Sequence, residues 1–347
     1  MTPSAAADCI YLASRAIRDL PGRGDSSYTV FSKLSKIREF PVRTSLRIAG
    51  IGLLLTFGLT TLAVADDNPT VLVGGATGRQ GTAVVDDLLA RGFAVRGLTR
   101  KPESKGAVAL AEKGVEMVQG DYADPGSLLA AMQGIDKVFF YSGFSRNEVA
   151  EGNNVIDAAK ASGINHLVYS SGAAAEPGVG VEGSAKAEIE LAIISSGIPY
   201  TVLRPVAFME NFNRQQKRTA KMGIIDSRDP DRELHFIAIR DIGFLAGEAF
   251  ANPGEWIGKA INIAGDSMSV EAYVDTFSNV MGREVVYTQL PLEQYLQTMP
   301  QPLRPLFQWY EEVGYTADVA GLRERYPNLV TLEQYLRATG WENWQEP

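Results

Sequence analysis

The sequence predicts an α/β fold, in which a doubly wound parallel sheet is followed by a smaller C-terminal lobe. From Asp66 onward, short apolar runs typical of strands alternate with longer stretches of helical spacing. The first apolar run ends in three regularly spaced glycines. Strands separated by helices favour right-handed parallel crossovers. We expect one domain over residues 66–347, with the sheet within about 69–205 and the lobe mostly within 206–347.

The glycine turn follows a predicted strand at Thr70–Val73 and precedes a predicted helix at Thr82–Arg91. Gly75 permits a tight turn, Gly78 lets the backbone approach a diphosphate, and Gly81 lets the helix pack on the sheet. Unpaired N–H groups at the helix start would then face the phosphates. An ordinary glycine-rich turn is the alternative, but the strand before it and the helix after it favour a dinucleotide site. The residues expected to contact the cofactor here are Gly75, Thr77, Gly78, Arg79, Gln80 and Gly81.

The residues after the second strand bear on which dinucleotide is bound. The predicted strand Ala94–Leu98 ends in Thr99, Arg100 and Lys101, with no acid to hold the ribose 2′-hydroxyl of NAD. Arg100 and Lys101 suit the 2′-phosphate of NADP, because a guanidinium can bind a phosphate through two hydrogen bonds. A solvated basic loop is the alternative. The sequence therefore favours NADP(H).

Later strands place polar residues at the same edge of the sheet. Ligands of doubly wound sheets bind beyond the carboxyl ends of the strands, so one crevice can hold side chains from several strands. Those expected there are Arg100, Asp121, Tyr141, Ser170 and Arg204. The elements are predicted at Val115–Gln119, Pro125–Met132, Lys137–Tyr141, Glu148–Ser162, His166–Tyr169, Ala185–Ser196 and Tyr200–Leu203, with a small-residue loop at Ala173–Gly183.

The C-terminal lobe has weaker signals. Asn213–Asp231 is typical of a surface helix followed by a loop, and prolines between Pro291 and Pro305 break up a segment that could lie over the substrate crevice. Asp241 is expected to be the N-cap of a helix. The other elements are strands at His235–Ile239, Ala260–Ala264 and Glu284–Thr288, and helices at Asp241–Ala251, Val270–Met281 and Leu332–Ala338.

A set of short motifs resembles the NmrA-like family, atypical relatives of the short-chain dehydrogenases/reductases. The resemblance covers almost all of residues 68–344. It implies an NAD(P)-binding Rossmann core, a preference for NADP(H) and a C-terminal substrate lobe. The family includes reductases of quinones, dyes and phenylpropanoids, and also redox-sensing regulators. The motifs lie at Gly75–Gly81, Val168–Ser171, Ala185–Glu190, Tyr200–Pro205, Phe208–Phe212, Arg240–Gly243, Ile261–Gly265 and Leu332–Leu336.

The candidate catalytic residues are Lys186, Ser170 and Ser171. Typical members of the wider superfamily carry a tyrosine four residues before a lysine, which lowers the pKa of the phenol that protonates the nascent alkoxide. Lys186 is present, but Glu182 stands at the tyrosine position. A serine could polarise a carbonyl, and Lys186 could hold the ribose hydroxyls or act as the acid. Alternatively, Lys186 is a helix lysine paired with Glu182 or Glu190.

The missing tyrosine restricts the reaction. Reduction of a simple ketone builds a strongly basic alkoxide, which needs a positioned acid, whereas quinones, imines and electron-poor dyes give better-stabilised anions. We therefore expect an NADPH-dependent reductase of an electron-poor small molecule such as a quinone. The alternative is a non-catalytic NADP(H)-sensing regulator that acts through a protein partner. Residues that could wall an apolar pocket over the nicotinamide, unless they pack as core, are Tyr141, Phe144, Phe208, Met209 and Phe212.

Other classes of function are disfavoured. The net charge is −8, and since residues 1–65 carry eight Lys/Arg and four Asp/Glu, the rest of the chain carries about −12, a poor match for nucleic acid. The histidines are His166 and His235, and neither has the neighbours of a zinc site, so we expect no metal. No G-x-S-x-G nucleophile elbow follows a predicted strand. The single cysteine, Cys9, lies before the predicted domain, which therefore has no disulfide.

Residues 1–65 are expected to be an export leader or a membrane anchor. Arg43 and Arg47 precede an uncharged stretch, residues 48–65, which ends in small residues typical of a signal-peptide cleavage site. About eighteen apolar residues can also just span a bilayer. Because a leader normally starts the chain, we expect translation to begin near Val42. The domain would then be periplasmic or membrane-anchored, and a cytoplasmic location is the alternative, because free NADP(H) is scarce outside the cytoplasm.

Overall fold

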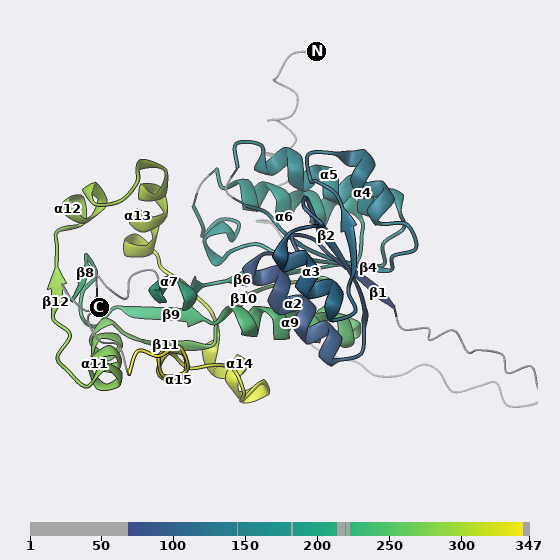
Figure 1. Cartoon of the computed structure of the whole chain (residues 1–347). Helices are drawn as coiled ribbons and strands as arrows, with labels where there is room; N and C mark the ends of the chain where they lie inside the picture. The colour runs from purple at the N-terminus through teal and green to yellow at the C-terminus, as the bar shows by residue number, and fades with distance from the viewer. Residues whose placement is uncertain (1–68, 144, 182, 214–218, 220–222, 343–347) are drawn as a thin grey trace, which may run out of the picture. The chain divides into compact units, whose positions relative to one another are not determined.

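A seven-stranded parallel sheet organises the protein in a computed structural model that describes residues 69–143, 145–181, 183–213, 219 and 223–342. The strands are β1 (Thr70–Val73), β2 (Ala94–Thr99), β3 (Glu116–Gln119), β4 (Lys137–Tyr141), β5 (His166–Ser170), β6 (Tyr200–Pro205) and β10 (Lys259–Ile263). Their spatial order is β3-β2-β1-β4-β5-β6-β10, so the order reverses between β1 and β4 (Figure 1). This is the predicted doubly wound sheet, and its switch point lies where β1 leads into the glycine turn.

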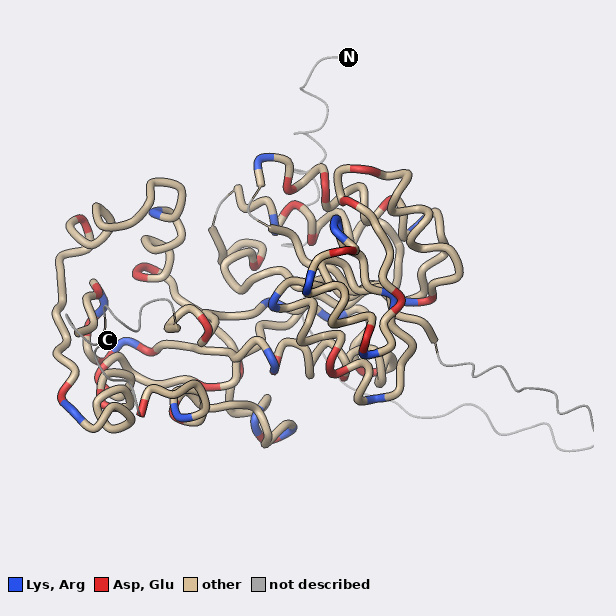
Figure 2. Tube along the Cα trace, viewed as in Figure 1, with Lys and Arg blue, Asp and Glu red and all other residues tan. Residues whose placement is uncertain are grey.

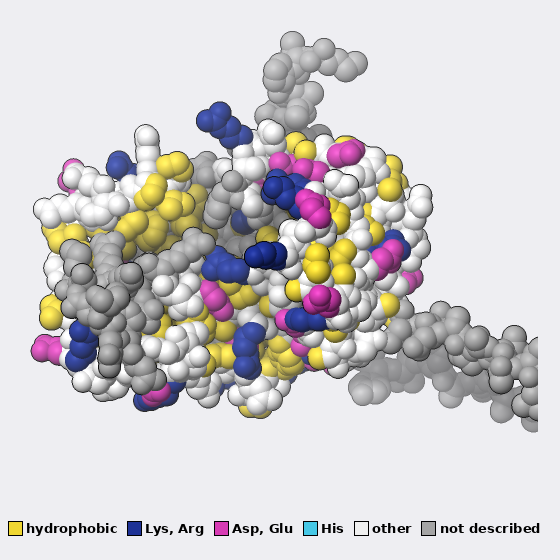
Figure 3. All heavy atoms as spheres, in the orientation of Figure 1, with side chains coloured by type: hydrophobic (Ala, Val, Ile, Leu, Met, Phe, Trp, Pro, Cys, Tyr) yellow, Lys and Arg dark blue, Asp and Glu magenta, His cyan; other side chains and the backbone are white. Residues whose placement is uncertain are grey.

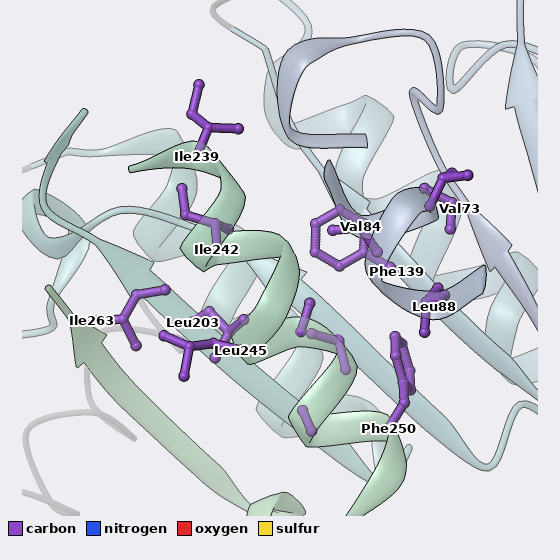
Figure 4. Close-up of a cluster of buried hydrophobic side chains, with 14 of the residues drawn as sticks. Val73, Val84, Leu88, Phe139, Leu203, Ile239, Ile242, Leu245, Phe250 and Ile263 are labelled. Carbon is purple, nitrogen blue, oxygen red and sulfur yellow. The ribbon is translucent and has the colours of Figure 1, made fainter. Parts of the chain in front are cut away.

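Helices cover both faces of this sheet, as the alternation within β1 shows. Val71 and Val73 belong to the buried cluster under α2, α3 and α9, whereas Leu72 belongs to the cluster under α4, α5 and α6. This alternation is expected for a strand buried on both sides. Figure 4 shows the first cluster, with Val84 of α2 facing the α9 side chains across the core. The helices are α2 (Arg79–Ala90), α3 (Lys105–Glu112), α4 (Pro125–Ala131), α5 (Glu148–Ala161), α6 (Ala185–Ser196) and α9 (Ile239–Ala251).

Two glycines of α9 bring its backbone against α2. A Cβ at Gly243 would lie 2.4 Å from the Ala83 carbonyl oxygen, and a Cβ at Gly247 would collide with the Asp87 carboxylate. At the far end of this contact, Arg91 binds Asp87 over 2.5 Å and Glu248 over 2.7 Å. We call this glycine-lined contact between α2 and α9 the helix seam. It fixes the position of α2, whose N-terminus faces the switch point.

The second half of the chain thus completes the core, since both α9 and β10 follow residue 206 and β10 pairs with β6. The helix predicted to start at Asp241 starts at Ile239, and its N-cap is Ala238. The N-cap prediction for Asp241 is therefore wrong. Its buried carboxylate instead accepts the backbone N–H of Val330 over 2.8 Å, which ties the C-terminal segment to α9.

The C-terminal lobe contains two small sheets, ordered β11-β9-β7 and β12-β8. The segment with many prolines is largely helical rather than broken, because its prolines precede helices or occupy their first turn. The segment Asn213–Asp231, predicted as a surface helix followed by a loop, contains the strand β8 (Ile224–Asp226) where the loop was expected, and its residues 214–218 and 220–222 lie outside the described structure. The lobe elements are β7 (Ala207–Phe208), α7 (Glu210–Asn213), β8 (Ile224–Asp226), β9 (Glu233–Ile237), α10 (Pro253–Trp256), β11 (Asp266–Ser269), α11 (Val270–Met281), β12 (Tyr287–Gln289), α12 (Leu292–Gln297), η2 (Gln301–Leu303), α13 (Arg304–Glu312), α14 (Val319–Arg325) and α15 (Leu332–Ala338).

The predicted leader, residues 1–65, lies outside the described residues. Within the part of the chain that is described, no helix is both long enough and apolar enough to cross a membrane.

Candidate functional site

The first turn of α2 is a helix N-terminus that no side chain caps. The helix begins at Arg79, three residues before the predicted start, and its N-cap is Gly78, which has no side chain to offer. The N–H groups of a first helical turn have no partner within the helix, and they favour an anion. The backbone amides of Arg79, Gln80 and Gly81 are therefore suited to phosphate oxygens, as the glycine pattern predicts.

The three glycines of the turn meet different constraints. Gly75 has a φ of +63°, a conformation that favours glycine, and a Cβ at Gly81 would lie 2.2 Å from the Gly75 carbonyl oxygen. The space beside Gly78 is bordered by a side chain, because a Cβ there would lie 2.0 Å from the Tyr141 hydroxyl. That hydroxyl donates to the Gly75 carbonyl over 3.2 Å. Tyr141 is thus brought to the glycine turn, as predicted, and its phenol is bound to the backbone of the turn.

Ser170 and Gln80, two predicted site residues, are hydrogen-bonded to each other. Ser170 Oγ at the end of β5 donates to Gln80 Oε1 in the first turn of α2 over 2.7 Å. Ser171 is also buried, and its hydroxyl forms no well-made hydrogen bond among the described residues. The two serines therefore differ, since Ser170 supports the phosphate-facing turn while the Ser171 hydroxyl is buried and does not bond to that turn.

The residues predicted to select NADP lie where the sequence placed them. Arg100 and Lys101 directly follow β2, and both are exposed. Asp121 follows β3, the neighbouring strand, but its carboxylate accepts the backbone N–H of Ala123 over 3.0 Å. Asp121 therefore stabilises its own turn, while the two basic residues extend into solvent beside the carboxyl end of β2.

Lys186 is bound to residues that the sequence did not single out. Its ammonium donates to the Ser142 carbonyl over 3.0 Å, to the Ser142 hydroxyl over 2.8 Å and to Glu148 Oε1 over 2.7 Å. Of the two expected partners, Glu190 binds Arg204, and Glu182 lies outside the described residues. We call Ser142, Glu148, Tyr169 and Lys186 the lysine cluster.

The lysine cluster contains a tyrosine from another strand. The phenol oxygen of Tyr169 lies 2.8 Å from Ser142 Oγ. Ser142 Oγ also donates to Glu148 Oε1 over 2.6 Å, and because it has one proton, it must accept from Tyr169. Burial raises the pKa of Tyr169, which agrees with a phenol that keeps its proton. Tyr169 therefore does not replace the absent tyrosine of the superfamily.

Two residues of the proposed apolar pocket wall pack as core. Met209 is fully buried in the lobe, and the Phe212 ring packs against Phe236 and Phe277 at centroid distances of 5.5 and 5.4 Å. Phe208 packs against the cluster under α2 and α9, and Phe144 lies outside the described residues. The alternative of core packing is therefore correct for Met209 and Phe212.

Arg204 is also occupied by other protein groups. Its guanidinium binds both carboxylate oxygens of the fully buried Glu190, with the shortest distance 2.6 Å, and lies 3.6 Å from Glu176 Oε1. Arg204 thus stands at the end of β6, as predicted, but it is used to hold α6 and the loop after β5 together.

One acidic residue beside the glycine turn was not predicted as a site residue. A groove of about 700 Å³ runs between the starts of α2 and α9, and Arg79 and Glu210 both line it. Glu210 Oε1 accepts the backbone N–H of Ile239 over 2.9 Å, while its Oε2 is buried without a partner among the described residues. Burial raises the pKa of this carboxyl. The motif Phe208–Phe212 contained Glu210, but the pattern alone gave it no role.

The charge distribution and the potential metal ligands do not indicate a second site among the described residues. Basic and acidic residues are interspersed along the described chain (Figure 2), and on the face shown in Figure 3 they are scattered among apolar and neutral groups. Among the described residues, no group of three or more His, Cys, Asp or Glu could hold a metal ion. His166 is buried at the start of β5, where its ring nitrogen bonds Thr201 Oγ1 over 2.9 Å.

An uncapped helix start, a glycine turn and a parallel sheet that reverses order beside them define a Rossmann-type dinucleotide-binding protein. The sequence profile of the NmrA-like family matches residues 67–341, and the chain belongs to this family. The resemblance in the motifs is therefore confirmed.

Similar proteins include reductases and a transcriptional regulator. The chain is 30% identical to an NAD(P)H azoreductase of Xenophilus azovorans over 66% of this chain and 80% of the relative. The structure of the NADPH-dependent quinone oxidoreductase QOR2 of Escherichia coli, complexed with NADPH, matches with a TM-score of 0.70 and 24% identity, over 78% of this chain and 99% of that one. The structure of NmrA, a negative transcriptional regulator in complex with NADP, matches with a TM-score of 0.66 and 22% identity, over 78% and 94%.

Proposed function

We propose that this protein binds NADP(H) and transfers hydride to an electron-poor small molecule such as a quinone. The observation that carries the proposal is the uncapped start of α2, with Gly78 as N-cap, at the same sheet edge as the Lys186 ammonium. The azoreductase and quinone oxidoreductase relatives support a reaction of this type.

The chain's own residues would divide the binding between them. The backbone N–H groups of Arg79, Gln80 and Gly81 would donate hydrogen bonds to the diphosphate, and Arg100 and Lys101 would bind the 2′-phosphate. The bound cofactor supplies the hydride. Lys186 contributes a fixed positive charge near the ends of β4 and β5, which stabilises the anion that forms on the reduced acceptor.

The absence of a proton-donating phenol beside Lys186 favours acceptors that give stabilised anions. The phenol of Tyr169 is fully buried and donates its hydrogen bond to Ser142, so it is not directed at an acceptor molecule. A quinone becomes a stabilised hydroquinone anion that water can protonate, whereas the alkoxide from a simple ketone is far more basic.

The test is steady-state oxidation of NADPH with a panel of quinones and a panel of simple ketones. We expect faster turnover with the quinones, and a loss of turnover in Lys186→Ala. Glu151→Gln, which changes a half-buried acid of α5 outside the lysine cluster, is the matched control. Faster turnover with simple ketones would refute the proposed substrate class.

A second candidate is an NADP(H)-sensing regulator. The observation that favours it is that the donors of Lys186 are directed to acceptors within the protein. The similarity to the fold of NmrA is consistent with this role. Micromolar NADPH binding without oxidation by any acceptor of the panel would favour the regulator, and sustained oxidation abolished by Lys186→Ala would exclude it.

We also propose that residues 48–65 act as an export leader or membrane anchor. The proposal rests on the uncharged stretch, the arginines before it and the small residues at its end. N-terminal sequencing of the protein from its native cells tests it. A start just after Ala65 is expected for a cleaved leader, a start near Val42 for an anchor, and a mature start between residues 1 and 40 would count against both.

A further inference from the structure

Glu148 is the residue of the lysine cluster that has no assigned role. It is the first residue of α5, its side chain is 6% exposed, and the Lys186 side chain is 18% exposed. A negative charge at the start of a helix interacts favourably with the helix dipole. The pair is therefore a largely buried ion pair at the edge of the sheet where the cofactor is expected.

The direction of the hydrogen bonds follows from the number of protons in the cluster. Lys186 can only donate, and the Glu148 carboxylate can only accept. The single proton of the Ser142 hydroxyl goes to Glu148, so Ser142 Oγ accepts from both Lys186 and Tyr169. Each polar group of the cluster is then satisfied in one arrangement, with Lys186 charged, Glu148 charged and Tyr169 neutral.

This arrangement restricts where the Lys186 ammonium can go. The carbonyl and hydroxyl of Ser142 lie directly after Tyr141, whose phenol reaches the glycine turn. The aliphatic part of the Lys186 side chain also passes near Gly172, since a Cβ added at Gly172 would lie 3.8 Å from Lys186 Cδ. The ammonium is thus held between the ends of β4 and β5, where Glu148 Oε1 lies 2.7 Å from it as a largely buried acidic partner.

We propose that Glu148 is the positioning residue for Lys186, holding its ammonium at the ends of β4 and β5 in the orientation that catalysis uses. This inference rests on the proposed reductase function. Glu148 acts through Lys186 and touches neither cofactor nor acceptor. Removing its charge weakens the hold on the Lys186 ammonium, so the fraction of molecules with a correctly placed cation falls.

The experiment is a double-mutant cycle with Glu148→Gln, Lys186→Ala and the double variant. We expect Glu148→Gln to lower kcat about tenfold or more, equivalent to about 1.4 kcal/mol in the barrier, with little change in the KM for NADPH. In the Lys186→Ala background the same change should have no further effect on kcat. Full activity of Glu148→Gln, or losses that multiply in the double variant, would overturn the proposal.

Stability is measured in parallel, because breaking a buried ion pair also destabilises the fold. All rates are taken well below the melting temperature of each variant. If Glu148→Gln does not fold, Ser142→Ala replaces it, since it removes the bridging hydroxyl but keeps the direct ion pair. A smaller loss of kcat that also vanishes in the Lys186→Ala background supports the proposal, and a loss that persists there contradicts it.

The outcome can be separated from that of the proposed function. If the wild-type protein oxidises no NADPH with any acceptor, the reductase proposal fails. The same double-mutant cycle is then carried out with the dissociation constant for NADPH as the measured quantity. A shared loss of affinity in Glu148→Gln and Lys186→Ala, not deepened in the double variant, then supports positioning of Lys186. Independent losses or no loss reject it.

Discussion

Ser170 Oγ donates to Gln80 Oε1 over 2.7 Å, which joins the end of β5 to the first turn of α2. We expect Ser170→Ala to weaken NADPH binding about fivefold, because a hydrogen bond that orders this turn is worth about 1 kcal/mol. Ser171→Ala is the matched comparison, and it should leave the affinity unchanged while lowering kcat. Binding titrations followed by NADPH fluorescence measure the affinities, and the reverse pattern in the two serine variants would contradict the assignment.

Gly78, at the start of α2, can be required for two reasons: to leave room for the diphosphate, or to leave room for the Tyr141 hydroxyl. Gly78→Ala places a methyl group against the Tyr141 hydroxyl and into the phosphate-facing turn. We expect NADPH affinity to fall at least about tenfold, equivalent to about 1.4 kcal/mol.

Combining Gly78→Ala with Tyr141→Phe removes the hydroxyl that would collide. We expect the melting temperature to recover while NADPH binding stays weak, because the methyl group still blocks the diphosphate. Recovery of binding in the double variant would mean that Gly78 is needed for Tyr141 and not for phosphate.

The basic residues after β2 should determine the preference between cofactors. Arg100→Ser is expected to raise the dissociation constant for NADPH about tenfold and to leave that for NADH unchanged, since a charge-assisted hydrogen bond is worth roughly 1.5–3 kcal/mol. Lys113→Ser is the control, because Lys113 is an exposed lysine at the C-terminal end of α3, where it pairs with Asp86 of α2. Equal losses for both cofactors in Arg100→Ser would rule out recognition of the 2′-phosphate.

The helix seam should be sensitive to a single methyl group. Gly243→Ala brings a Cβ to 2.4 Å from the Ala83 carbonyl, a backbone atom that cannot move alone, so we expect a loss of about 1–3 kcal/mol in the free energy of unfolding. Gly254→Ala is the matched control, because a Cβ there meets nothing within 4 Å. Urea unfolding of the two variants measures the difference, and equal stabilities would show that the seam relaxes without cost.

His166 should make the protein less stable in mild acid. Thr201 Oγ1 donates to the Trp256 carbonyl, so His166 Nε2 is the donor to Thr201, and the buried Nδ1 has no proton and no partner among the residues that the structure describes. Burial lowers the pKa of His166 to about 4 from the usual 6.5. The unfolded chain therefore takes up the proton first, and stability that is complete above pH 6.5 is lost as the pH falls toward 4.

At pH 5 this loss is about 2 kcal/mol relative to pH 7.5. Urea unfolding at the two pH values measures it for the wild type and for His166→Gln, whose amide can still donate to Thr201. We expect a shallower dependence on pH in the variant, and the same slope in both proteins would contradict the role of His166.

The sheet and the glycine turn could be predicted because their signals are local. Glycines three residues apart, directly after a strand, constrain the backbone through contacts within the turn itself, such as that of Gly81 with the Gly75 carbonyl. Arg100 and Lys101 likewise followed from their place after β2. Such features depend on neighbours in the sequence.

The lysine cluster could not be predicted in this way. Lys186 lies 38 residues from Glu148, and no spacing connects them until α5 and α6 pack side by side. The sequence offered acids four residues from Lys186, but Glu190 turned inward to Arg204. The sequence left open whether Phe212 lines a pocket or packs as core for the same reason, since that choice depends on partners from distant segments.

The helix seam has a consequence for the order in which the protein becomes competent. The backbone of α2 is pressed against a helix that begins at Ile239, well over a hundred residues later in the chain. During synthesis, the glycine turn leaves the ribosome long before the helix that will hold its start in place. A truncated chain ending at residue 205 would contain every glycine of the turn but would lack α9, which holds α2 and its N-terminal amides in position. We therefore expect the full-length chain to bind the nucleotide and the nascent chain not to bind it.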